Sequence, residues 1–327
     1  MPDIHYSARG FNANPPTATL PEQQKPTAGV GWDGVMTSSL LDVVTEAVAV
    51  GDSGIFTNQP KRSALQKIWR AATIEAFLEE SSEGFVLSTD HETLDGTERA
   101  QVSYHLGMAQ AALVAREALK VQTTVHSDLV LKLLYGKIAG KVAGEKRPDL
   151  LGYSFTPNSP KTFPRVLLEA KGTMDGTLSK PLNDALEQLN SPRHELVRLI
   201  GTEGIRAASV AYFPARRGMG AAPRVWASHF ADPPGGVVED PLQISDNEFT
   251  QLLNLAQLLP IRWAIDEVRE ELPERVEDDY AGGFVRAKLP FTDTFIALPT
   301  QIYTFLGGID TPFSTGAPPL RSSRNLA

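Results

Sequence analysis

The run Arg-Val-Leu-Leu-Glu-Ala-Lys at residues 165–171 carries the clearest structural signal in this chain. Val166, Leu167 and Leu168 are apolar on both faces, which is typical of a central strand covered on both sides. Because side chains alternate along a strand, Glu169 and Lys171 should share one face. Two charged side chains at the end of a buried strand are costly unless they have partners or bind a metal. We therefore expect a buried strand that ends in a functional site.

A further acidic residue, Asp149, follows Pro148 at the start of a second strand-like run, residues 147–155. The segment Thr-Pro-Asn-Ser-Pro-Lys-Thr-Phe-Pro at 156–164 is dense in turn formers and can reverse the chain between the two strands. Two carboxylates and a backbone carbonyl form a hard oxygen site suited to Mg²⁺ or Mn²⁺. Such an ion polarises a phosphodiester and lowers the pKa of bound water. A lysine beside it can orient the water or neutralise charge in the transition state.

The same three residues admit a purely structural interpretation. Glu169 and Lys171 can form a surface ion pair on a strand, and Asp149 can cap a turn. The two interpretations differ in geometry, because carboxylates that share an ion with oxygen ligands at roughly 2.0–2.6 Å should lie within about 5 Å of each other.

Pro148-Asp149 followed by Glu169-Ala170-Lys171 resembles the PD-(D/E)xK phosphodiesterase superfamily, which includes restriction endonucleases and RecB-like nucleases. The resemblance covers roughly residues 100–230. It implies an α/β fold with a restriction-endonuclease-like αβββαβ core and a mixed central sheet. It also implies that Asp149 and Glu169 bind Mg²⁺ or Mn²⁺, and that Lys171 is the catalytic lysine.

Two more positions are similar to features of that superfamily. A glutamate often lies on the helix before the first core strand, and Glu117 is the first candidate here, with Glu98 second; an ordinary solvated helix residue is the alternative. Gln188 stands where RecB-like members often carry a glutamine on the helix after the lysine strand. The tyrosine usual in that motif is absent, because the position four residues later is Pro192.

Around this core the sequence predicts flanking regions. Residues 1–35 are expected to be a disordered arm, 36–96 a helical region and 97–232 the nuclease-like core. Residues 233–309 are expected to form an α+β extension, an acidic helix plus strands packed on the core, and 310–327 a disordered tail. Helices are predicted at 97–121, at 127–143 with Ser127 as N-cap, and at 181–200, where Pro192 can split the helix. A further helix is predicted at 248–271, preceded by a capping box of Ser245 and Glu248. Strands are predicted at 147–155, 165–171, 205–213 and 224–230.

The charge is unevenly distributed. The whole chain carries −8, whereas residues 137–224 hold 14 Lys and Arg against 8 Asp and Glu, a local +6. A basic segment of this kind can bind the phosphates of a nucleic acid, although a solvated basic face is the equally simple alternative. The residues expected to line such a cleft are Lys137, Lys141, Lys146, Arg147, Arg216, Arg217 and Arg224.

Several classes of protein are excluded or disfavoured. The chain has no cysteine, so it can form no disulfide or thiolate zinc site, and its histidines lack ligand spacing. No apolar run is long enough to span a membrane, and the N-terminus has no apolar signal core, so we expect a cytoplasmic protein without membrane contact.

The sequence therefore predicts a metal-dependent nuclease that cleaves DNA, with DNA favoured over RNA, in restriction or antiviral defence. A homodimer or a partner protein of a defence complex is compatible with this prediction. The alternative is a nuclease-fold scaffold with little activity of its own, which binds nucleic acid or a partner protein.

Overall fold

The computed structural model describes residues 1–9, 32–50, 63–135, 146–154, 165–174, 178–190, 192, 194–201, 204–213, 227–231, 242, 244–279, 283–289 and 295–308. The helices are α1 (Leu40–Ala49), α2 (Ser63–Phe77), α3 (Gly96–Ala118), α4 (Ser127–Tyr135), α5 (Ser179–Asn190), α6 (His194–Ile200), α7 (Asp246–Glu271) and α8 (Thr300–Gly307). The strands are β1 (Asp3–Arg9), β2 (Trp32–Thr37), β3 (Leu78–Ser81), β4 (Gly84–Leu87), β5 (Val121–His126), β6 (Leu150–Ser154), β7 (Arg165–Thr173), β8 (Ile205–Tyr212), β9 (Ala227–Ala231), β10 (Val276–Asp279), β11 (Phe284–Lys288) and β12 (Phe295–Pro299).

A seven-stranded sheet in the order β2-β1-β9-β8-β7-β6-β5 forms the centre of the fold. β5, β6 and β7 are successive antiparallel neighbours, whereas β7 and β8 run parallel and are connected through α5 and α6. β9 is antiparallel to β8 and parallel to β1. The sheet is therefore mixed, which confirms the predicted α/β class.

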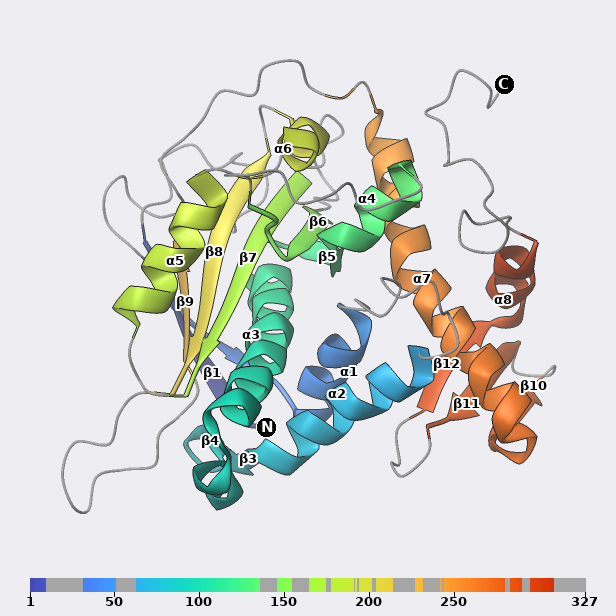
Figure 1. Cartoon of the computed structure of the whole chain (residues 1–327), viewed down its shortest axis with the longest axis horizontal. Coiled ribbons are helices and arrows are strands. Elements are labelled where there is room, and N and C mark those ends of the chain that lie inside the picture. The colour runs from blue at the N-terminus through green and yellow to red at the C-terminus, as the bar shows by residue number, and fades with distance from the viewer. Residues whose placement is uncertain are drawn as a thin grey trace.

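Helices cover both faces of this sheet. α3 and α5 each pack against β7 and β8, and Figure 1 shows them on opposite sides of the sheet. α1 and α2 add to the layer of α3. The buried run Val166–Leu168 of β7 thus lies between two helical layers, as its apolar sequence predicts.

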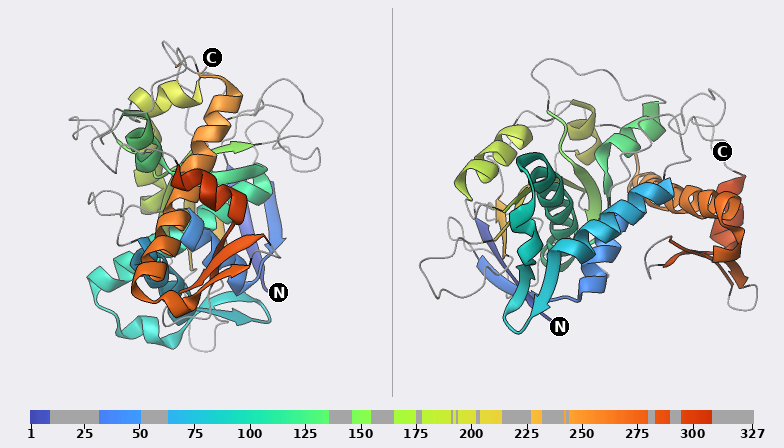
Figure 2. Two further views of the ribbon diagram at one scale, coloured as in Figure 1. Left: turned by 90° about the vertical axis from the view of Figure 1, so that its right-hand side faces the viewer. Right: turned by 60° about the horizontal axis from the view of Figure 1, so that its bottom comes forward.

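The C-terminal region forms a smaller unit around α7. Strands β10, β11 and β12 make an antiparallel three-stranded sheet that packs with α8 against α7. Figure 2 shows this unit at one end of the molecule, away from α5. Ser245 and Glu248 form the predicted capping box at the start of α7, and Pro260 lies inside the continuous helix.

Two glycines set the distance between α3 and β7. A Cβ atom on Gly172 would lie 1.8 Å from the carbonyl oxygen of Ser103, and one on Gly107 would lie 2.7 Å from the backbone of Lys171 and Gly172. Neither contact leaves room for a side chain. Backbone-to-backbone packing therefore fixes α3 against the strand that carries Glu169 and Lys171.

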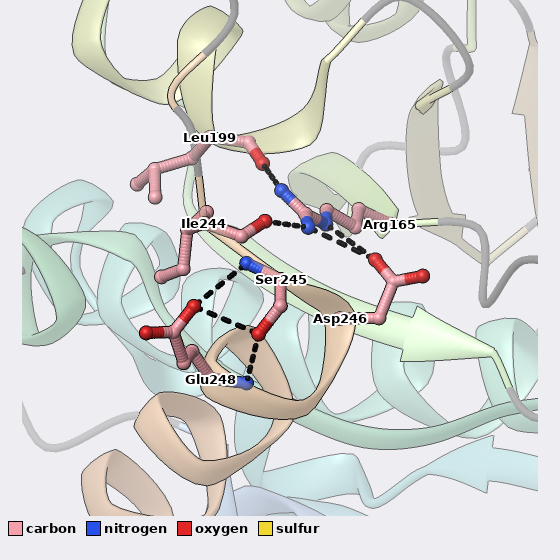
Figure 3. Close-up of polar contacts among 6 residues, drawn as sticks. All are labelled: Arg165, Leu199, Ile244, Ser245, Asp246 and Glu248. Carbon is pink, nitrogen blue, oxygen red and sulfur yellow. Dashed lines mark hydrogen bonds and ion pairs between the residues drawn. The ribbon is translucent and has the colours of Figure 1, made fainter. Parts of the chain in front are cut away.

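Arg165 joins the start of β7 to two later helices (Figure 3). Its guanidinium donates to the carbonyl oxygens of Leu199 at 2.7 Å and Ile244 at 2.6 Å, and pairs with Asp246 at 2.9 Å. The cation also lies 4.7 Å from the centre of the Phe249 ring. One nearly buried side chain thus secures the beginning of β7, the end of α6 and the start of α7.

Some elements differ from the sequence predictions. Residues 3–9 and 32–35, expected within a disordered arm, and residues 36 and 37, expected in the helical region, form β1 and β2 of the central sheet, with Ile4, Tyr6 and Met36 buried. Residues 121–126 form β5, which the sequence analysis had not recognised between two helices. The helical segment predicted at 181–200, in contrast, is divided into α5 and α6 at Pro192, as the sequence indicates.

Ser127 is not the N-cap that the sequence predicts. It is the first residue of α4 and fully buried, and its hydroxyl donates to the carbonyl oxygen of Pro148. This contact directs Ser127 toward the segment that carries Asp149.

Candidate functional site

Glu169 and Lys171 lie in β7 and extend from the same face of the strand. Glu169 is only 1% exposed, whereas the side chain of Lys171 is 28% exposed. The Lys171 ammonium donates a hydrogen bond to Glu169 Oε1. The burial of Glu169 excludes the interpretation of this pair as a surface ion pair.

The register of β6 on β7 brings Asp149 next to Glu169. Leu150 pairs with Leu168, so Asp149, the residue before β6, lies beside Glu169. Asp149 Oδ2 accepts a hydrogen bond from the backbone N–H of Ala170 at 3.0 Å. Asp149 thus caps the end of the ladder and also stands beside the second carboxylate, so the expected capping role is compatible with a functional one.

Ser127 positions Asp149 from the neighbouring strand. The backbone N–H of Ser127 donates to the Asp149 carbonyl oxygen at 2.9 Å, and its hydroxyl donates to Pro148. Both donors belong to the junction where β5 passes directly into α4. Ser127 therefore fixes the Pro148-Asp149 backbone from two sides.

The two carboxyl groups perturb each other. Burial, and second the charge of Asp149, raise the pKa of Glu169 to about 8, against the lowering effect of Lys171. Burial likewise raises the pKa of Asp149 to about 6, while Lys171 and the Ala170 N–H act in the opposite direction. Because they interact strongly, the two groups titrate as a pair that retains about one proton near neutral pH.

The donor set fits a hard divalent cation in one respect. Glu169 Oε2 is buried and has no hydrogen-bond partner in the described part of the chain. A cation would satisfy this oxygen and offset the repulsion between the carboxylates. Within the described residues, however, no group of three or more His, Asp or Glu side chains is arranged to hold a metal. Asp149 and Glu169 would thus need backbone oxygens, water or substrate as further ligands.

Sequence reasoning missed two neighbours of this pair. Tyr104 of α3 lies close enough for the charges of Asp149 and Glu169 to add to the effect of burial in raising its pKa. Asp128 follows Ser127, is buried, and pairs with Arg147 at 3.2 Å. Arg147 and Asp128 thus flank the Pro148-Asp149 segment. Neither neighbour belongs to the recognised motif, and their positions follow from the packing of α3 and α4.

Glu117 and Glu98, the other acidic residues predicted for the site, make their contacts elsewhere on α3. Glu117 lies ten residues after Gly107 on α3, about 15 Å further along the helix axis at 1.5 Å per residue. It forms an ion pair with Lys120 at 3.6 Å, and its charge raises the pKa of Tyr6. Glu98 completes the capping box of α3 by accepting from the Asp95 N–H at 3.0 Å.

Gln188 is half-buried on α5, and within the described residues no hydrogen bond joins it to Asp149 or Glu169. The carbonyl oxygen of the adjacent Leu189 accepts from Arg206 at 3.1 Å. Five residues of the predicted basic cleft lie outside the described residues: Lys137, Lys141, Arg216, Arg217 and Arg224. Lys146 and Arg147 are described and exposed.

Comparisons with protein-family models, with curated proteins and with solved structures gave no match. Among the described residues, no helix has the length and apolar character required to cross a lipid bilayer.

Proposed function

We propose that the chain is a metal-dependent nuclease that hydrolyses phosphodiester bonds of DNA. Asp149 and Glu169 would hold Mg²⁺ or Mn²⁺, and Lys171 would act beside them. When bound, such an ion supplies Lewis-acid charge and a more acidic water molecule. The ammonium of Lys171 would orient the attacking water and neutralise negative charge that develops on the phosphate.

One observation carries this proposal: the carboxyl groups of Asp149 and Glu169 lie together with Lys171, and the buried Glu169 has a carboxylate oxygen without a partner among the described residues. A protein does not bury such a pair for stability, because desolvation opposes both charges. Groups with strongly perturbed pKa values cluster at functional sites. The arrangement therefore favours a site that acts on a ligand.

The order of elements supports the same proposal. The sequence α3, β5, β6, β7, α5, β8, with β7 and β8 parallel, follows the αβββαβ order that the resemblance to the PD-(D/E)xK superfamily implies, with α4 and α6 as additions. DNA as the substrate, and restriction or antiviral defence as the setting, rest on that resemblance. The basic segment 137–224 is compatible with phosphate binding.

A scaffold that binds nucleic acid or a partner protein is the second candidate. It is favoured by the small donor set, since the described residues provide two carboxylates and no third acidic or histidine ligand. In that case Asp149 and Glu169 would bind no catalytic metal ion, and Lys171 would remain paired with Glu169.

A cleavage assay separates the two candidates. Plasmid and labelled oligonucleotides would be incubated with the protein in Mg²⁺, Mn²⁺ or EDTA. Lys171→Ala and Asp149→Ala should each reduce cleavage at least about 100-fold, because each removes a group that acts in the transition state. Glu75→Gln, an exposed acidic residue of α2, is the control and should cleave normally. Cleavage that survives both site substitutions would refute the site, whereas no cleavage of any nucleic acid by the folded wild type would favour the scaffold.

A further inference from the structure

A pocket of about 410 Å³ is lined by residues of α2 and α3. Its walls include Gln66, Trp69 and Arg70 from α2 and Gln101, Tyr104 and His105 from α3. This volume falls within the range of small-molecule sites, about 300–1000 Å³. None of the described side chains that line it is acidic, and Arg70 supplies a positive charge. The pocket therefore suits a neutral or anionic ligand.

Trp69 gives the pocket an exposed aromatic surface. Its side chain is 51% exposed, which is unusual for a residue of this size. The His105 ring stands against it at 5.3 Å, with an angle of 78° between the ring planes. This contact holds the indole in place and leaves half of its surface open to a planar ligand.

His105 adds an unused hydrogen-bonding atom. Its Nδ1 is buried and has no partner in the described part of the chain. Burial, and second the charge of Arg70, lower the pKa of His105 to about 4, so the ring is neutral at physiological pH. The buried ring thus forms an uncharged part of the wall, whereas the amides of Gln66 and the exposed Gln101 can both donate and accept hydrogen bonds. Such groups recognise the polar edge of a heteroaromatic ring.

Tyr104 connects this pocket to the candidate catalytic site. It lines the pocket and lies near Asp149 and Glu169, whose charges act on its hydroxyl. The preceding residue, Ser103, contacts the backbone of Gly172, one residue after Lys171. A chain molecule bound with its phosphate at the carboxylates can thus place a neighbouring group in the pocket.

We propose that this pocket binds one unpaired base of a nucleic-acid strand, stacked on Trp69 and hydrogen-bonded to Gln101. The inference rests on the proposed nuclease function for the position of the strand's phosphate. It goes beyond that function by assigning a single-stranded or unpaired segment as the preferred substrate. Stacking on an aromatic side chain is a general way to hold an unpaired base, whereas the faces of a base within a duplex are covered by its neighbours in the stack.

Binding in EDTA tests the inference without requiring cleavage. A fluorescein-labelled dT10 strand, a 10-mer of abasic phosphate and a blunt duplex would be titrated with the protein and followed by anisotropy. Wild type should bind dT10 about 10-fold or more tightly than the abasic strand or the duplex. Trp69→Ala should lose this preference, and Trp69→Phe should retain most of it.

Leu65→Ala is the matched control, because Leu65 is an exposed residue of the same helix that does not line the pocket. It should bind like the wild type, and circular dichroism would verify that all variants are folded. Equal affinity of the wild type for dT10 and the abasic strand would overturn the inference. So would tight, Trp69-dependent binding of the mononucleotide dTMP at the affinity of dT10, since that result would assign the pocket to free nucleotides.

The binding and cleavage assays distinguish a failure of the pocket proposal from a failure of the nuclease proposal. Cleavage that requires Lys171, without any effect of Trp69 on strand binding, would refute the pocket and leave the nuclease in place. Trp69-dependent base binding by a folded protein that cleaves no nucleic acid would refute the nuclease proposal and leave the pocket proposal in place.

Discussion

Replacing Glu169 with glutamine should stabilise the metal-free protein, by an amount that grows with pH. Glutamine has nearly the same shape, but it cannot carry the charge that burial disfavours. In the folded protein the pKa of Glu169 is raised from 4.5 to about 8. Between those values the unfolded chain releases a proton that the folded chain retains, so the stability of the wild type falls as pH rises.

The size of the stability difference between the variant and the wild type follows from this single proton. The free energy of unfolding of Glu169→Gln should gain about 1.4 kcal/mol on the wild type for each pH unit between about pH 5 and pH 8. At pH 7 this corresponds to roughly 3 kcal/mol, and near pH 4 to almost none. The carboxyl of Asp149 shares the same environment, so replacing it with asparagine should give a smaller effect of the same sign.

Urea unfolding in EDTA at several pH values measures this difference. The exposed variant Glu75→Gln is the control and should follow the wild type at every pH. Millimolar Mg²⁺ or Mn²⁺ should then stabilise the wild type and leave Glu169→Gln unchanged, because the ion binds the folded carboxylate pair. A pH-independent difference, or a glutamine variant less stable than the wild type at pH 8, would refute the electrostatic reasoning.

Three further predictions concern packing and the limits of the site. Gly172→Ala should destabilise the fold by about 3 kcal/mol or more, because the new methyl group would meet the Ser103 carbonyl, and thermal unfolding measures the loss; an unchanged melting temperature would contradict the close approach. Arg165→Met should lower the free energy of unfolding, measured in urea, by about 3 kcal/mol, because Asp246 and two carbonyl oxygens lose their partner. A loss below about 0.5 kcal/mol would show that these contacts do not stabilise the fold. Glu117→Gln should leave any nuclease activity within about twofold of the wild type, and a loss of two orders of magnitude would return this residue to the site.

Sequence periodicity identified the elements that have strong local signals. The apolar run before Glu169 predicted a buried strand, and the helices at α3, α5 and α7 follow from good helix formers and from the Ser245 capping box. β5 escaped recognition because six residues between two helices give too short a pattern for a period to emerge. β1 was missed because its alternation lies next to a segment rich in Pro, Thr and Asn.

The candidate site was predictable only in part, because local patterns reveal contacts within one segment but not contacts between distant segments. Alternation within one strand places Glu169 and Lys171 together, and this can be read from adjacent residues. Tyr104 and Asp128 reach the pair through α3 and α4, and no local pattern marks them. Glu117 was chosen for its residue type and helix. Its distance from the pair depends on where α3 crosses β7.

The sequence by itself therefore determined the strand at 165–171 and the common face of Glu169 and Lys171, because both depend on the geometry of a single extended segment. The tertiary structure decided that Asp149 joins them, since the pairing of Leu150 with Leu168 is a long-range register that one segment cannot specify. It also decided that Glu169 is buried, with an oxygen that has no partner in the described part of the chain, and that Tyr104 near this pair lines a pocket with Trp69. The burial of a side chain and its distance from residues of other segments arise only when the helices and the sheet pack together, so no single segment of the sequence specifies them.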